Sequence, residues 1–118
     1  MFHIRKFPNI IKKLQDIRHN IYLYYIRYNI YRARDIQDLI NIIKNIAAKN
    51  KYITTDEIFT ILTDSIKKYP LTDIELQNLS TWEQIHNSEG GEKNYVATVF
   101  WLCIIQAIQE NEQPKLLL

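Results

Sequence analysis

Three histidines and one cysteine are the side chains of this sequence best suited to catalysis or metal binding. They are His3, His19, His86 and Cys103, and they lie far apart along the chain. Asp16 lies three residues before His19, so one helix would place both on one face, but two ligands are too few to hold a metal ion. The apolar neighbours of Cys103 indicate a buried, unreactive thiol. The sequence also has no glycine-rich phosphate-binding pattern. We therefore expect no enzymatic activity, no metal and no cofactor.

Carboxylates are concentrated in one segment of the chain. Residues 69–92 include five acidic residues and no lysine or arginine. Trp82 lies among them, and carboxylates around an aromatic residue suit docking onto a basic partner protein. The alternative is a solvated acidic face with Trp82 in the core. The predicted partner-binding residues are Asp73, Glu75, Trp82, Glu83, Glu89 and Glu92.

The N-terminal segment has the opposite charge. Residues 1–34 hold eight lysines and arginines against one acid, whereas residues 35–118 hold seven against twelve. Arginines and tyrosines are interleaved in the basic segment, a pattern that suits nucleic-acid phosphates and bases. Two other interpretations stay open: the tyrosines are core and the basic residues are the solvated side, or the segment touches an anionic membrane surface. The predicted nucleic-acid contacts are Arg18, Arg27, Arg32 and Arg34.

A long helix must carry these basic residues. Between about residues 8 and 32, apolar and aromatic side chains recur at alternating gaps of four and three, which predicts a helix with a seven-residue repeat. Further apolar residues beside this repeat favour packing inside a bundle over a two-stranded seam. We name the repeat the heptad stripe; it consists of Ile10, Leu14, Ile17, Ile21, Tyr24, Tyr28 and Tyr31.

Capping residues divide the rest of the chain into further helices. Asp35 is a predicted N-cap of a helix over 36–49, and Thr54 and Thr72, each followed three residues later by glutamate, predict two more starts. Ser80 forms a third such pair with Glu83, which would allow the chain to break and restart there. Residues 93–109 are apolar on nearly every side, as expected of a central helix. The predicted fold is all-α: one domain over 1–118, with five or six helices around an apolar C-terminal helix.

Length and composition limit the cellular setting. A chain of 118 residues suits a single domain with its own core. One cysteine cannot form an internal disulfide, no apolar run is long enough to span a bilayer, and no secretory signal is evident. We expect a cytoplasmic protein whose oligomeric state the sequence leaves open.

The chain resembles the small immunity proteins that bacteria encode beside secreted toxins, such as those of contact-dependent growth inhibition systems. The resemblance lies in size, single-domain cytosolic character, the excess of isoleucine, asparagine, lysine and tyrosine that AT-rich codons produce, the absent catalytic motif and the acidic segment Thr72–Glu92. It implies an antitoxin-type protein that binds and neutralises a cognate toxin, with the acidic residues facing a basic cleft if that toxin is a nuclease. The basic N-terminal segment departs from the acidic balance expected of a nuclease inhibitor. The alternative from another class is a small nucleic-acid-binding protein that uses the first helix.

Overall fold

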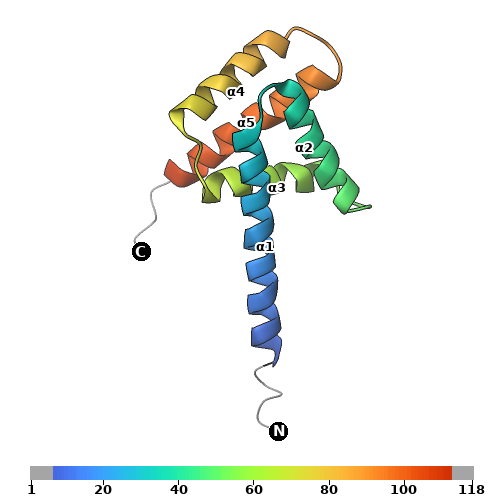
Figure 1. Ribbon diagram of the computed structural model, residues 1–118, viewed down its shortest axis with the longest axis vertical. Coiled ribbons are helices and arrows are strands. Elements are labelled where there is room, and N and C mark those ends of the chain that lie inside the picture. Colours follow the sequence, from blue (N-terminus) through green and yellow to red (C-terminus); the bar gives the residue numbers. More distant parts are fainter. Residues whose placement is uncertain (1–6, 113–118) are drawn as a thin grey trace.

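The computed structural model describes residues 7–112, which form five helices and, within that range, no strand (Figure 1). The all-α prediction is confirmed. The helices are α1 (Phe7–Arg32), α2 (Ile36–Lys49), α3 (Thr55–Lys68), α4 (Asp73–His86) and α5 (Glu92–Glu112).

Side-chain caps begin α2 and α3 where the sequence predicts. The Asp35 carboxylate accepts a hydrogen bond of 3.1 Å from the backbone N–H of Asp38, and the Thr54 hydroxyl accepts one of 3.1 Å from the backbone N–H of Glu57. Each bond satisfies a backbone donor that has no partner inside its helix. Both predicted starts are therefore confirmed.

Helix α4 begins with a complete capping box. The Thr72 hydroxyl accepts a hydrogen bond from the backbone N–H of Glu75, and the Glu75 carboxylate accepts one of 3.0 Å from the backbone N–H of Thr72. The predicted break at Ser80 is wrong, because α4 runs without interruption to His86. A residue that can cap a helix does not stop one whose backbone bonds are already continuous.

Helix α5 is the centre of the body, as predicted. It packs against α2, α3 and α4, and Phe100, Cys103 and Ile104 on it are almost completely buried. These residues belong to one core that also contains the inner faces of α2 and α3. One side of α5 stays open to solvent, where Tyr95 and Leu102 are about half exposed.

Helix α1 packs through a different face from the one the sequence suggests. Leu23, Ile26 and Ile30 are buried, and α1 lies against α2 and α3. All seven residues of the heptad stripe are exposed, so the prediction that this stripe enters the bundle is wrong. The interpretation of the tyrosines of the stripe as core is wrong for the same reason.

The length of α1 contributes to the exposure of the heptad stripe. Its 26 residues span about 39 Å, whereas the 14-residue helices of the body span about 21 Å. Every residue over 9–19 is exposed, and Figure 1 shows this part of α1 projecting from the body. The radius of gyration is 17.0 Å, against about 13 Å for a compact domain of this size.

A buried ion pair fixes α1 against the start of α4. The two terminal nitrogens of Arg27 donate to the two carboxylate oxygens of Glu75 at 2.5 and 2.6 Å. Arg27 also donates to the carbonyls of Tyr69 and Pro70, at 2.6 and 3.1 Å. Only 8% of each charged residue is exposed. One guanidinium therefore satisfies backbone acceptors in the α3–α4 connection while it neutralises the buried carboxylate.

This environment lowers the pKa of Glu75. Burial alone would raise the pKa, but the hydrogen bonds from Arg27 and Thr72, together with the guanidinium charge, hold it below its ordinary value. A carboxyl whose pKa is lower in the folded state stabilises the fold above its unfolded pKa, and that stabilisation disappears as the pH falls through the folded pKa.

Glu75→Gln should lower the free energy of unfolding at neutral pH by about 3 kcal/mol, because it leaves the charge of Arg27 buried without a partner. The difference from the natural sequence should shrink as the pH falls from the ordinary glutamate pKa toward the lowered pKa of Glu75, because protonation then removes the charge of the natural side chain too. Urea unfolding followed by circular dichroism at several pH values measures both effects.

Glu110→Gln is the matched control. Glu110 also pairs with a cation, Lys67 at 3.3 Å, but that pair is partly exposed on the surface, and its loss should change stability far less. Equal effects of the two substitutions at neutral pH would contradict a structural role for the buried pair.

Candidate functional site

The predicted acidic residues do not form one surface. Glu75 is buried in its ion pair with Arg27, so its prediction as a partner contact is wrong for the folded protein. Trp82 is half-buried and packs against the core, and Glu83 beside it is half-buried too. Asp73 is exposed at the start of α4, about 15 Å along the helix from Glu83.

The other two acids lie beyond the opposite end of α4. Glu89 and Glu92 are both exposed. The Glu89 carboxylate lies 2.8 Å from the Nδ1 atom of His86, and this hydrogen bond lowers the pKa of Glu89 from its ordinary value. A Glu92 oxygen lies 3.8 Å from the ammonium nitrogen of Lys44. The segment that lacks lysine and arginine in the sequence therefore meets cations from two other parts of the fold, Arg27 of α1 and Lys44 of α2.

The candidate chemical residues also stay apart. His19 is exposed on the projecting part of α1, His86 is engaged with Glu89, and His3 lies outside the described residues. Within residues 7–112, no three histidine, cysteine or carboxylate side chains lie close enough together to hold a metal ion. The thiol of Cys103 is fully buried and donates to the carbonyl of Phe59 at 3.6 Å.

The heptad stripe forms a row of exposed apolar and aromatic side chains along α1. Each of its seven residues is between 44% and 64% exposed. A continuous row of exposed apolar and aromatic side chains of this length is typical of an interaction site.

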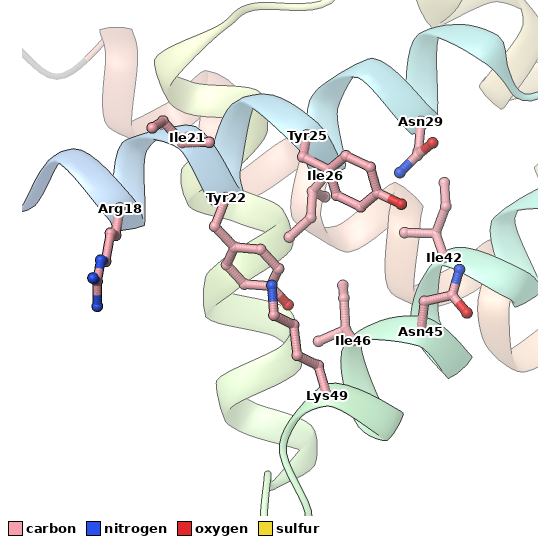
Figure 2. A pocket seen from close by; sticks show the side chains of 10 residues that line it. All are labelled: Arg18, Ile21, Tyr22, Tyr25, Ile26, Asn29, Ile42, Asn45, Ile46 and Lys49. Atoms are coloured by element: carbon pink, nitrogen blue, oxygen red, sulfur yellow. The ribbon is translucent and has the colours of Figure 1, made fainter. Parts of the chain in front are cut away.

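A groove between α1 and α2 lies next to this stripe. We call it the α1–α2 groove; its volume is about 660 Å³. Ile26, Ile42 and Ile46 form its apolar floor. Ile21 belongs to both the groove and the heptad stripe, and Tyr25, which also lines the groove, lies beside the stripe. Figure 2 shows Arg18 at one end of the groove and the amides of Asn29 and Asn45 at the other.

Polar groups line the wall of the groove. The ammonium group of Lys49 lies 4.4 Å from the ring centre of Tyr22, a cation–π contact that is visible in Figure 2. The Tyr22 hydroxyl is buried without a hydrogen-bond partner, and burial raises its pKa. With Arg18 at the same end, the groove combines an apolar floor with two cations and no carboxylate in its lining.

A second, polar groove continues along the same two helices. It shares Asn29, Ile42 and Asn45 with the α1–α2 groove and adds Arg32 and Arg34 to the lining. Arg32 also lies over the ring of Tyr28, 5.7 Å from its centre. Three of the four predicted nucleic-acid contacts, Arg18, Arg32 and Arg34, therefore lie along adjoining grooves. The fourth, Arg27, is buried, and its prediction as a contact is wrong.

No protein-family model, curated protein or solved structure matches this chain. In the part of the chain that the structure describes, no helix is both long and apolar enough to cross a membrane.

Sequence reasoning missed the part of the site that α2 contributes. Ile42, Ile46 and Lys49 recur at gaps of four and three, so they share one side of α2. This spacing could have indicated a second apolar side of α2. It is hard to recognise because another row of apolar residues, which includes Leu39 and Ile43, follows the same gaps of three and four on the adjacent side of the helix.

Burial raises the pKa of Cys103 to about 11. We expect the native protein to react with a disulfide reagent at mildly alkaline pH at least about a hundredfold more slowly than a free thiol. The reaction can be followed by absorbance, with protein unfolded in guanidinium as the control that reacts fully. Rapid reaction of the native protein would contradict a buried thiol.

Proposed function

We propose that this chain is a non-enzymatic binding protein that neutralises a cognate protein toxin, and that α1 is its docking element. The observation that carries the proposal is the exposed heptad stripe on a helix that projects from the body. The free energy falls when a partner removes apolar side chains from water, and a projecting helix can enter a cleft of the partner. The toxin itself is suggested by the resemblance to immunity proteins.

This proposal changes the docking surface expected from the sequence alone. Glu75 is neutralised, Trp82 and Glu83 are half-buried, and the remaining acids stand at opposite ends of α4. Such a set cannot present one concentrated negative field to a partner. The heptad stripe, by contrast, is a continuous row of exposed apolar and aromatic side chains along α1, which suits the buried centre of an interface.

Growth protection tests the proposal. If the proposal holds, the gene beside this one encodes a toxin that arrests growth when it is produced alone, and co-production of this chain restores growth. Ile17→Asp in the heptad stripe should abolish protection and weaken the purified complex at least about tenfold, because it buries a charge at the interface centre.

Two control variants decide which surface docks. Ile74→Asp changes an apolar residue of α4 that is 71% exposed, and it should leave protection intact. Glu89→Lys should also have little effect. If Glu89→Lys abolished protection while Ile17→Asp did not, the acidic segment would be the docking surface and the proposal would be wrong.

A nucleic-acid-binding function is the second candidate, favoured by the cations that line the adjoining grooves. Arg18, Arg32, Arg34 and Lys49 would contact phosphates, and Tyr25 offers a ring for stacking. If four phosphates are contacted, the logarithm of the affinity for single-stranded RNA should fall with the logarithm of salt concentration with a slope of about −3.

Fluorescence anisotropy with a labelled oligonucleotide at several salt concentrations measures this slope. Arg34→Glu should flatten it under the nucleic-acid function. Lys68→Glu serves as a control of equal charge change, because Lys68 is exposed on α3 and lines neither groove. The absence of binding at low salt would exclude this second candidate.

A further inference from the structure

The residues beside the heptad stripe carry charge of one sign. In a seven-residue repeat, two positions flank the apolar stripe and face the corresponding residues of a partner helix. On α1 these flanking residues are Ile11, Lys13, Arg18, Asn20, Tyr25, Arg27 and Arg32. Four of them are basic and none is acidic. Because Arg27 is already paired with Glu75, the exposed flanking charges are those of Lys13, Arg18 and Arg32.

The spacing of the stripe indicates a helical occupant. Gaps of four and three average 3.5 residues, slightly less than one turn of a straight α-helix, so the stripe drifts slowly around α1. A second helix that winds around α1 with a left-handed supercoil follows this drift. A flat surface such as a bilayer does not.

The flanking charges argue against a second copy of this chain. One set of flanking residues directly follows stripe residues (Ile11, Arg18, Tyr25 and Arg32), and the other set directly precedes them (Lys13, Asn20 and Arg27). In a parallel pair of helices, the first set of one helix faces the second set of the other helix; in an antiparallel pair, each set faces the same set of the other helix. Either arrangement of two α1 helices would bring Lys13, Arg18 and Arg32 against basic or neutral residues only. Like charges across such a seam are destabilising.

We infer that the occupant of the heptad stripe is an amphipathic helix of another protein, with apolar residues at a seven-residue repeat and aspartate or glutamate beside them. Its acids would face Lys13, Arg18 and Arg32, and Lys49 at the mouth of the α1–α2 groove adds a further cation on the side of Arg18. This inference rests on the proposed function, because it names the partner element that α1 binds.

Model peptides test the inference on the full chain. Each peptide has about four heptads with isoleucine and leucine on its stripe. One carries glutamate at all flanking positions and the second carries lysine there. A third keeps the glutamates and replaces the apolar stripe with serine. We expect the first peptide to bind most tightly. The affinities for the other two, measured by fluorescence anisotropy, should be at least about tenfold weaker.

Variants of the chain provide the matched comparison. Ile17→Asp should abolish binding of the glutamate peptide, whereas Ile74→Asp should leave it unchanged, and both residues are exposed, so neither change disturbs the core. The double variant Lys13→Glu and Arg18→Glu should reverse the preference, so that the lysine peptide binds more tightly than the glutamate peptide. Circular dichroism verifies that each variant is folded.

Three results would overturn the inference. They are equal binding of the glutamate and lysine peptides, dimerisation of the chain that Ile17→Asp abolishes, and binding to anionic vesicles with no binding to the glutamate peptide. Growth protection that depends on Ile17, without binding of the glutamate peptide, would retain the proposed function and reject the acidic helix. Peptide binding without growth protection would support the acidic helix and reject the toxin as its source.

Discussion

The orientation of α1 depends on the contact between Arg27 and Glu75. Four hydrogen bonds from one guanidinium join α1 to the α3–α4 connection and to the capping box of α4. Arg27 lies on the same side of α1 as Leu23, Ile26 and Ile30, so the ion pair and the apolar contacts select one rotation of the helix. At about 100° per residue, this side lies about 140° around the axis from the heptad stripe, which therefore faces solvent.

The same contact changes the meaning of the charge pattern. In the sequence, positive charge is concentrated before residue 35 and negative charge after it, which suggests two opposed surfaces. In the fold, Arg27 of the basic segment instead pairs with Glu75 of the acidic segment in the interior, and their two charges cancel. What remains outside is a basic α1 and a dispersed set of acids. Charge that is separated along a chain thus need not be separated on its surface, because contacts between residues 48 apart intervene.

Local features of the fold were predictable, and the orientation of α1 was not. The starts of α2, α3 and α4 follow from Asp35, Thr54 and Thr72, because a cap acts on backbone groups only three residues away. The sequence of α1 offers two apolar faces, and periodicity favours the longer one. The shorter face is chosen by packing and by Arg27, whose partner is set by tertiary structure. The groove was missed for a related reason, since it exists only where α1 and α2 meet.

The division of α1 into a docked half and a projecting half suits its proposed role. An isolated helix of about 11 residues is only marginally stable in water, because its first turn is costly to form. The docked half, which contains Ile26 and Ile30, supplies that first turn, so the projecting half needs only to extend a helix that already exists. A partner would then meet the heptad stripe in its binding geometry, and less conformational entropy would be lost on association. The contact between Arg27 and Glu75 would therefore favour the proposed binding at Leu14 and Ile17 without touching the partner.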